Sequence, residues 1–342
     1  MVFLASARPP LMLRAWAQAE CGVASGTPLR VENETGLNLL RAAANCTDGG
    51  LLEADWAGVI TLDTPISIAS GMFLSITGED AWAEVRGGNQ TRMFEVSRGG
   101  GLNLTTLKLS GGTEIRGGAI YSDSAVLNLD NCTFYSNVAT NGNGGAVWAD
   151  GGNVTIVGGA FRGNDAKNYG GAVGTVGATL VVQKGSIFDG NTALVGGALY
   201  CRGVNESALA RCSLDDTDFT SNNATEGTIM FDLDFLEGVE GGGAVALLFA
   251  GANITDSVFS DNHALNSGGA VLGGNVTSMT VNGCKFENNT AVNFGGAIAA
   301  ASMTLGGNTK LTGNKATSND DAATSNSGVA TPSGGAVSAT AW

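Results

Sequence analysis

The sequence is poor in the residues that many enzymes and most nucleic-acid-binding proteins use. It contains one histidine and five prolines in 342 residues, and only 14% of its residues are charged. The 17 basic residues are outnumbered by 31 acidic ones, and a net charge of -14 argues against nucleic-acid binding, which needs basic stripes. The 53 glycines with only five prolines exclude collagen and favour a fold dense in turns.

Two further classes of protein lack support in the sequence. No run of 18 apolar residues occurs, so no membrane span is predicted in this chain. Neither the EF-hand spacing nor a glycine-aspartate nonapeptide is present, so we predict no metal site and no cofactor.

What the sequence does contain is a repeated tetrapeptide, Gly-Gly-Ala followed by Ile, Val or Leu. Its copies begin at Gly117, Gly144, Gly170, Gly196, Gly242, Gly268, Gly295 and Gly334. A second motif, Phe-x-x-Asn, keeps the same register. Its copies are Phe134/Asn137, Phe161/Asn164, Phe188/Asn191, Phe219/Asn222, Phe259/Asn262 and Phe286/Asn289, with Leu311/Asn314 as a degraded seventh. A recurring step of about 26 residues indicates one supersecondary unit stacked many times.

Each unit predicts three short strands. Residues 144–169 hold three short apolar runs separated by Gly, Asn and Asp. Such runs are typical of strands and turns, and the spacing of a helix is absent. Three strands in register describe one coil of a parallel β-helix, with about 26 residues per coil and coils about 4.8 Å apart. The fold class is therefore all-β.

The motifs have structural roles in such a coil. Paired glycines allow positive φ at a sharp corner, and the alanine permits close packing beside it. The following aliphatic residue and the Phe of the second motif are expected to face the core. The Asn side chains are expected to form a ladder along the stack.

The predicted domain extends beyond the motifs. Residues 20–342 form a single β-helix domain, with the repeats at 117–337 and insertions at 226–240 and 315–333. Residues 58–118 alternate as half-buried strands do. Residues 34–46 are predicted to be a short helix, with Thr35 as its N-cap, that caps the first coil. The last repeat leaves no room for a full coil, so we expect a fragment of a longer array or an end that pairs with something else.

The N-terminus and the sequons indicate secretion. Residues 1–19 are a candidate signal segment, although Arg8, Pro9, Pro10 and Arg14 interrupt its apolar stretch. Eleven of the Asn residues lie in Asn-x-Ser/Thr sequons, more than chance predicts, which favours a glycosylated protein. The alternative is that Asn and Thr are both favoured in β-helix turns and strands. Four sequons precede the middle strand and would place sugars on one face: Asn103, Asn153, Asn253 and Asn275.

Six cysteines divide into two kinds. Cys201 and Cys212 flank an enlarged coil, so a disulfide between them would clamp its loop, and Cys21 and Cys46 could tie the N-terminal segment to the cap. Cys132 and Cys284 each precede a motif Phe by two residues. They are expected to be inward-facing, free thiols, because they lie many coils apart.

A search for catalytic groups finds weak candidates only. His263 follows a ladder Asn and is expected to be a solvated turn residue. Acidic residues cluster at Asp215, Asp216 and Asp218, with Arg202 and Arg211 nearby in sequence. The pattern of a hydrolase would need a further Asp and a Gly-His-Gly, and neither is present. We therefore predict no catalytic residues, with a polysaccharide lyase or glycoside hydrolase as the alternative.

A row of aromatic residues is the candidate binding surface. If the aliphatic residue of the tetrapeptide points inward, the next residue points outward. This places Tyr121, Trp148 and Tyr200 in an exposed stripe, interrupted by Gly174. Such a stripe suits sugar rings or protein contacts. If the alternation is reversed, these residues belong to the core.

The two motifs in register resemble the repeats of the polymorphic outer membrane proteins of Chlamydia. The resemblance covers residues 117–337 and implies a right-handed, pectin-lyase-like β-helix passenger displayed at a surface, with a role in adhesion. This chain departs from the family in lacking the C-terminal translocator barrel, and its sequons point to a eukaryotic relative. We therefore expect a secreted or cell-surface, adhesin-like or structural protein that binds extracellular glycans or proteins. An ice-binding solenoid would need a Thr-x-Thr ladder that the repeats do not show.

Overall fold

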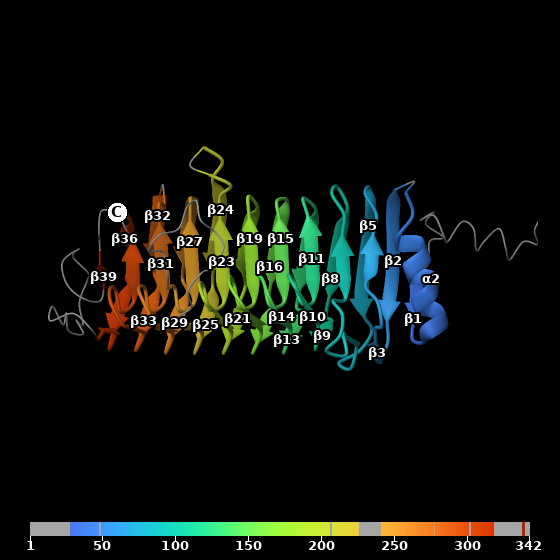
Figure 1. Cartoon of the computed structure of the whole chain (residues 1–342), viewed down its shortest axis with the longest axis horizontal. Coiled ribbons are helices and arrows are strands. Elements are labelled where there is room, and N and C mark those ends of the chain that lie inside the picture. Colours follow the sequence, from blue (N-terminus) through green and yellow to red (C-terminus); the bar gives the residue numbers. More distant parts are fainter. Residues whose placement is uncertain are drawn as a thin grey trace, which may run out of the picture.

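The computed structural model describes residues 28–47, 49–205, 207–225, 241–276, 278–300, 302–317 and 337–338. They form one solenoid whose coils are stacked along the long axis, with a single helix at one end (Figure 1). Every strand pair between coils is parallel. The predicted all-β parallel β-helix is confirmed, and its geometry is consistent with the right-handed form.

Four sheets run along the solenoid, and each coil contributes one strand to each sheet it reaches. Sheet A has 11 strands: β1 (Leu29–Val31), β2 (Gly50–Trp56), β5 (Met72–Gly78), β8 (Gly101–Thr105), β12 (Val126–Asp130), β16 (Asn153–Val157), β20 (Thr179–Gln183), β24 (Ala210–Asp215), β28 (Ala250–Thr255), β32 (Ser278–Asn282) and β36 (Thr304–Gly306). Sheet B has 10 strands: β3 (Val59–Thr61), β6 (Glu84–Arg86), β9 (Lys108–Ser110), β13 (Thr133–Tyr135), β17 (Ala160–Arg162), β21 (Ser186–Asp189), β25 (Thr217–Thr220), β29 (Val258–Ser260), β33 (Lys285–Glu287) and β37 (Lys310–Thr312).

The other two sheets complete the coil. Sheet C has 10 strands: β4 (Ile66–Ile68), β7 (Phe94–Val96), β11 (Ile120–Asp123), β15 (Val147–Asp150), β19 (Val173–Val176), β23 (Leu199–Arg202), β27 (Val245–Leu248), β31 (Val271–Gly274), β35 (Ile298–Ala300) and β39 (Val337–Ser338). Sheet D has eight short strands: β10 (Thr113–Glu114), β14 (Val138–Ala139), β18 (Asp165–Ala166), β22 (Thr192–Ala193), β26 (Asn223–Ala224), β30 (His263–Ala264), β34 (Thr290–Ala291) and β38 (Lys315–Ala316).

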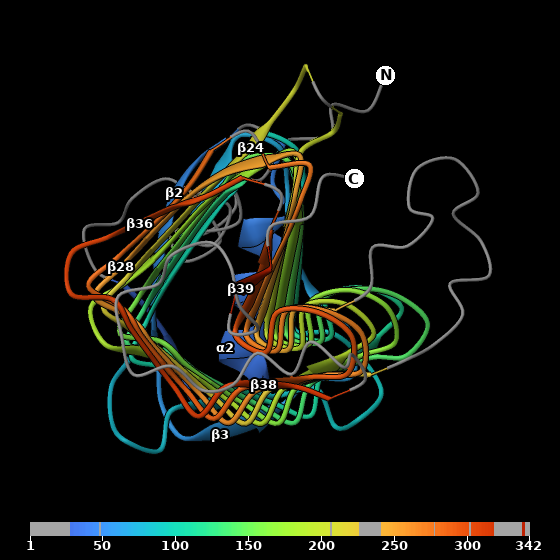
Figure 2. The same cartoon turned by 90° about the vertical axis from the view of Figure 1, so that its left-hand side faces the viewer.

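Viewed along the axis, the coils superimpose and the helix closes one end of the stack (Figure 2). This helix, α2 (Glu34–Ala44), buries Leu37 and Leu40 against the first coil. The capping helix is thus confirmed, but the predicted N-cap is wrong. Asn33 is the cap: its side chain accepts a hydrogen bond from the Gly36 backbone at 3.1 Å, while Thr35 lies inside the first turn.

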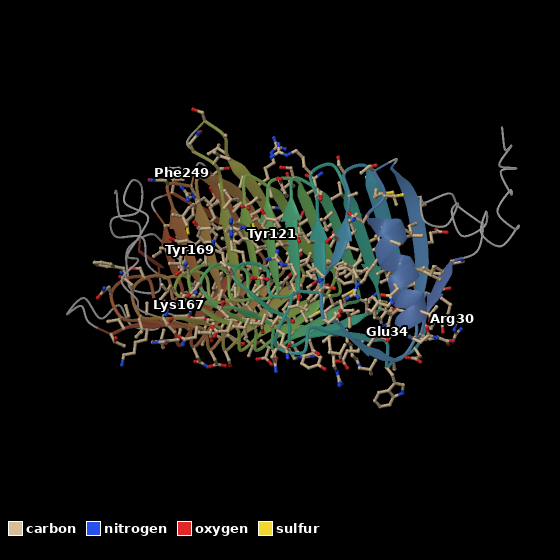
Figure 3. All side chains as sticks on the ribbon, turned by 45° about the vertical axis from the view of Figure 1, so that its right-hand side comes forward. Arg30, Glu34, Tyr121, Lys167, Tyr169 and Phe249 are labelled. Carbon is tan, nitrogen blue, oxygen red and sulfur yellow. The ribbon has the colours of Figure 1, made fainter. Side chains whose placement is uncertain are left out.

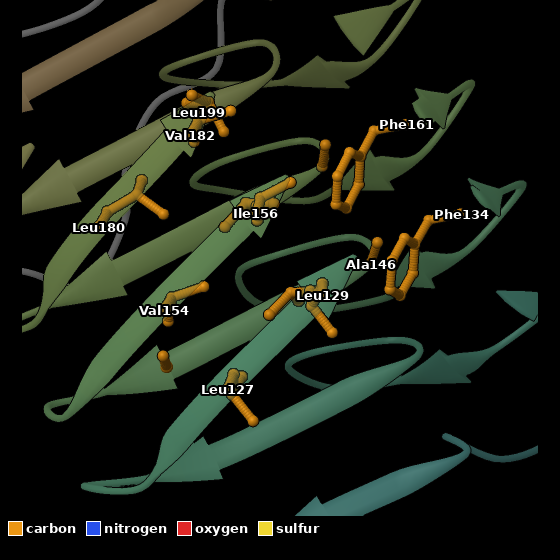
Figure 4. Close-up of a cluster of buried hydrophobic side chains, with 14 of the residues drawn as sticks. Leu127, Leu129, Phe134, Ala146, Val154, Ile156, Phe161, Leu180, Val182 and Leu199 are labelled. Atoms are coloured by element: carbon orange, nitrogen blue, oxygen red, sulfur yellow. The ribbon is translucent and has the colours of Figure 1, made fainter. Parts of the chain in front are cut away.

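The core is a continuous column of inward-facing side chains from sheets A, B and C (Figure 4). Strands of the motif-poor segment 58–118 contribute as the alternation predicts: Ile66, Ile68, Leu74, Ile76, Leu102, Leu104, Leu107 and Leu109 are all fully buried. The insertion predicted at 226–240 lies outside the described residues. The one predicted at 315–333 begins too early, because Lys315 and Ala316 form β38.

Candidate functional site

The two glycines of each tetrapeptide have different structural roles. The first has a φ between 58° and 69° in the copies at Gly117, Gly144, Gly170, Gly196, Gly242, Gly268 and Gly295. The second lies against the next coil. A Cβ added to Gly171 would sit 2.0 Å from the carbonyl oxygen of Gly197, and the other copies are similar. The first glycine therefore makes the corner, and the second lets adjacent coils approach.

The phenylalanines of the second motif form a single stack inside the solenoid. Six rings, from Phe134 to Phe286, follow one another with centroids 4.6–4.9 Å apart and interplanar angles of at most 13°. Leu311 continues the column in register with Phe286, so the degraded seventh copy is structurally a full member. All six rings are completely buried, and none is available to a ligand.

The motif asparagines form the predicted ladder. Asn191 is typical: its Nδ2 donates to the Phe161 carbonyl and to Asn222 Oδ1, both at 3.0 Å. Its Oδ1 accepts the backbone N–H and the side-chain Nδ2 of Asn164, also at 3.0 Å. The ladder runs through Asn137, Asn164, Asn191, Asn222, Asn262, Asn289 and Asn314. Within it, each interior amide uses all of its donors and acceptors inside the protein.

The residue before each ladder Asn carries a signal that the sequence analysis missed. It adopts φ between 52° and 66° in every described copy: Ser136, Gly163, Gly190, Ser221, Asp261, Asn288 and Gly313. This left-handed corner explains why the second variable position of Phe-x-x-Asn holds only Gly, Ser, Asp or Asn. The motif is thus more specific than its two named residues.

The aromatic row has the predicted direction but not the predicted exposure. Tyr121, Trp148 and Tyr200 share the outer face of sheet C, opposite the core. Trp148 and Tyr200 are nevertheless only 2% and 1% exposed, and Tyr121 is half-buried. They belong to a second apolar cluster, because the segments leading into β19 and β23 bring Tyr169 and Val195 back over this face. Figure 3 shows Tyr121, Tyr169 and Phe249 along this flank.

The gap at Gly174 also has a physical reason. A Cβ there would lie 2.4 Å from the Trp148 ring, so the indole lies across Gly174. The indole reaches Tyr200, whose ring centroid is 6.5 Å away, and Tyr200 stacks on Tyr169 at 4.6 Å. The glycine therefore leaves room for the neighbouring aromatic ring and does not interrupt the row.

One carboxylate fixes the N-terminal end of this row. Asp150 accepts hydrogen bonds from Trp148 Nε1 at 2.9 Å and from the Tyr121 hydroxyl at 3.0 Å, and Arg116 lies 3.3 Å away. Burial and the nearby Asp150 carboxylate raise the pKa of Tyr121. These contacts hold the aromatic side chains in place as part of the fold.

The residues weighed as catalytic candidates are dispersed. Arg202 lies at the end of β23 in sheet C, whereas Arg211 and Asp215 stand at opposite ends of β24 in sheet A. Asp218 belongs to sheet B, and its pKa is raised by burial and by Asp216. His263 is not a turn residue as expected: it lies in β30, half-buried, with Nδ1 2.8 Å from Thr290 Oγ1. The two arginines and the three carboxylates thus do not converge on one face.

Comparison with known proteins identifies one family of repeats that is similar to parts of this chain. Three segments, residues 185–202, 256–274 and 283–301, match the family model described as the Chlamydia polymorphic membrane protein repeat. These three segments are therefore similar to polymorphic membrane protein repeats. Each matched segment contains one Phe-x-x-Asn and one Gly-Gly-Ala copy, as the resemblance implied. No curated protein and no solved structure gives a significant match.

Four cysteines are buried, free thiols: Cys132, Cys201, Cys212 and Cys284. Cys132 and Cys284 are free thiols facing inward as predicted, and burial raises the pKa of Cys132 to about 12. Cys201 and Cys212 come together, but the predicted disulfide is not formed: both are free, buried thiols. A hydrogen bond between them and burial raise the pKa of Cys212. They face the core from β23 and β24 and so do not clamp the loop. Cys46 is disulfide-bonded, while its predicted partner Cys21 lies outside the described residues.

The sequon asparagines divide between strands and corners. Asn103, Asn153 and Asn253 lie in strands of sheet A, with Asn153 and Asn253 exposed, and Asn275 is exposed just before β32. Asn275 adopts a positive φ of 48°. Three other sequon residues also have positive φ: Asn89, Asn131 and Asn288. Asn is favoured at such corners, which accounts for part of the sequon excess without any sugar.

The coils before the repeats contain two groups that sequence patterns did not reveal. The Glu84 carboxylate is almost fully buried on sheet B and accepts hydrogen bonds from Arg86, Ser110 and Tyr135. Burial alone would raise its pKa, but these donors outweigh burial and lower the pKa to about 2. Nearby, Trp82 is 72% exposed. Neither residue belongs to a repeated pattern, so periodicity could not indicate them.

Neither a metal-binding group of side chains nor a membrane-spanning helix is found in the described ranges. No group of three or more His, Cys, Asp or Glu side chains is arranged to hold a metal ion in this part of the chain. The one helix within these ranges is too short and too polar to cross a membrane.

Proposed function

We propose that the chain is an adhesin-like, surface-displayed or secreted β-helix that binds extracellular glycans or proteins without catalysing a reaction. The observation that carries this proposal is that the residues of the repeat motifs face inward, while other residues form the outer surface. The glycines, alanines, phenylalanines and asparagines of the repeats are all used inside the solenoid. Recognition is therefore left to the outward-facing residues that are not part of the repeat.

Several features support a location outside the cell or at its surface. The repeat is named for polymorphic membrane proteins, and the net charge of -14 suits a soluble surface domain. Within the same proposal, residues 1–19 direct secretion, residues 20–342 form one domain, and Cys21 pairs with Cys46. Sugars on Asn103, Asn153, Asn253 and Asn275 would project from the region of sheet A.

A polysaccharide lyase or hydrolase is the alternative, and one observation favours it. Asp218 lies two residues after Asp216 in the chain. Lys285, two strands away in sheet B, lowers the pKa of Asp218 by its positive charge. Elimination from an acidic sugar needs a base beside carboxylates on one face. The sequence analysis paired these carboxylates with Arg202 and Arg211, whereas in the structure Lys285 is the basic residue that lowers the pKa of Asp218.

The experiment that separates the two functions exposes the purified full chain to cultured cells and to neutral and acidic polysaccharides with Ca²⁺. Retention and release of shorter sugar chains are scored together. Retention without cleavage supports adhesion. Cleavage that disappears in Asp218→Asn and Lys285→Ala would establish the alternative, and absence of both retention and cleavage would remove the adhesive function.

A further inference from the structure

Exposed apolar side chains occur at separate places in the coils that precede the repeats, on sheet A, on sheet B and in one loop. Among the described residues, four of the nine large exposed ones lie before position 83: Leu51, Val59, Phe73 and Trp82. Trp82 is the extreme case at 72% exposure, whereas Trp56 and Trp148 are buried. An indole left in water is unusual, since tryptophan is highly buried on average. The loop that carries Trp82 is therefore a candidate binding site.

The loop from Gly78 to Ala83 is held rigidly. The Trp82 backbone N–H donates to Asp80 Oδ1 at 2.7 Å, and the Ala83 N–H donates to the Asp80 carbonyl at 3.2 Å. The Glu79 N–H donates to the Trp56 carbonyl at 2.9 Å, and Ala83 itself is buried. These hydrogen bonds hold the backbone of the loop, so little backbone conformational entropy is lost when a ligand binds.

Lys108 supports the indole from sheet B. Its Nζ donates to the Ala81 carbonyl at 2.7 Å and lies 5.7 Å from the centre of the Trp82 ring. This cation–π contact orients the ring while most of its surface stays open. The ammonium keeps further donors for a ligand, because a lysine has three. The second oxygen of Asp80 makes no hydrogen bond with the described residues, which leaves an acceptor at the same loop.

The surroundings of the ring decide between ligand classes. The loop and the strands next to it carry charged groups: Glu79 paired with Arg30, Asp80, Lys108, and Glu84, the strand partner of Lys108. A protein interface has an apolar core with charged residues depleted, and this neighbourhood is the reverse. A single flat ring among hydrogen-bonding groups instead matches a pyranose, which has one apolar C–H face and hydroxyls at its rim. The net charge of -14 disfavours sulfated or polyanionic chains.

We propose that Trp82 is a sugar-stacking platform, and that the Gly78–Ala83 loop with Lys108 forms a binding site for a neutral oligosaccharide. This proposal rests on the adhesive function proposed above and names its ligand class and its site. The pyranose ring packs on the indole, while Lys108 and Asp80 hydrogen-bond its hydroxyls. The aromatic row at Tyr121, Trp148 and Tyr200 has no contact role in this proposal, because two of its members are buried.

The test uses the full chain on an array of neutral and sulfated oligosaccharides, followed by titration of the best neutral binder against tryptophan fluorescence. Trp82→Ala is expected to lower the affinity at least tenfold, and Trp82→Phe, which keeps a ring, to lower it less. Phe73→Ala removes an exposed ring from sheet A and serves as the matched control with unchanged affinity. Thermal unfolding of Trp82→Ala should match that of the wild type, because the Trp82 side chain is 72% exposed.

Each outcome decides one of the two proposals. Equal affinity of Trp82→Ala and wild type, or binding only to sulfated chains, overturns the sugar platform while adhesion stands. Binding to cells without binding to any neutral sugar on the array also overturns it and points to a protein ligand. A wild-type chain that binds neither cells nor sugars removes the adhesive function itself.

Discussion

The asparagine ladder makes a quantitative prediction through Asn191→Ala. Asn191 is completely buried, and its truncation leaves two donors of Asn164 without partners, the backbone N–H and one Nδ2 hydrogen, and removes one hydrogen bond to the Phe161 carbonyl. A buried group that loses its partner costs about 1–3 kcal/mol, and relaxation of the coils offsets part of this. We expect the free energy of unfolding to fall by about 2–5 kcal/mol.

The assay is equilibrium unfolding in urea, with Asn128→Ala as the matched control. Asn128 also donates an amide hydrogen bond to a neighbouring coil, to Asn103 Oδ1 at 2.7 Å, but it faces solvent. Its truncation should change stability by less than about 0.5 kcal/mol. If Asn191→Ala lowers the free energy of unfolding no more than Asn128→Ala does, the ladder does not stabilise the solenoid. The structural role given to Phe-x-x-Asn would then be wrong.

Further predictions concern the ring stack, the tetrapeptide and the buried carboxylate. Phe188→Ala should cost about 3–5 kcal/mol in urea unfolding, because its ring fills the stack between neighbours 4.8 and 4.9 Å away; a near-neutral result would contradict the stack. Gly171→Ala should prevent normal stacking and sharply lower the melting temperature, whereas Gly163→Ala, with φ 56° but open space, should cost only about 1 kcal/mol. Because the folded pKa of Glu84 is depressed to about 2, its contribution of about 3 kcal/mol is complete above pH ~5 and is lost as the pH falls towards 2. Glu84→Gln should flatten that loss in acid unfolding, and an unchanged pH profile would exclude this role.

The fold could be predicted because its determinants are periodic. Phe161 and Asn164 recur in register with their equivalents, so the coil length, the inward faces and the ladder followed from spacing alone. Contacts between non-equivalent positions could not be predicted in this way. Tyr169 folds back over the row that contains Trp148, and no pattern within one coil indicates that the row is covered.

The helix and the cysteine pair show where local signals compete. Asn33 and Thr35 are both good N-caps in isolation, and the docking of α2 on the first coil decides between them. Cys201 and Cys212 were expected to form a disulfide around the loop, but they are free thiols whose side chains meet inside the core. Trp82 follows no pattern at all, and only its exposure in the folded chain distinguishes it from a core tryptophan.

The central claim is that the repeats build the scaffold and that other residues bind. The most direct measurement compares cell and glycan binding by two folded variants, Phe188→Leu inside the repeat stack and Trp82→Ala outside it. We predict that Phe188→Leu binds like the wild type, while Trp82→Ala loses affinity at unchanged stability. Loss of binding by a fully folded Phe188→Leu, with Trp82→Ala unaffected, would contradict the account and place recognition in the repeats themselves.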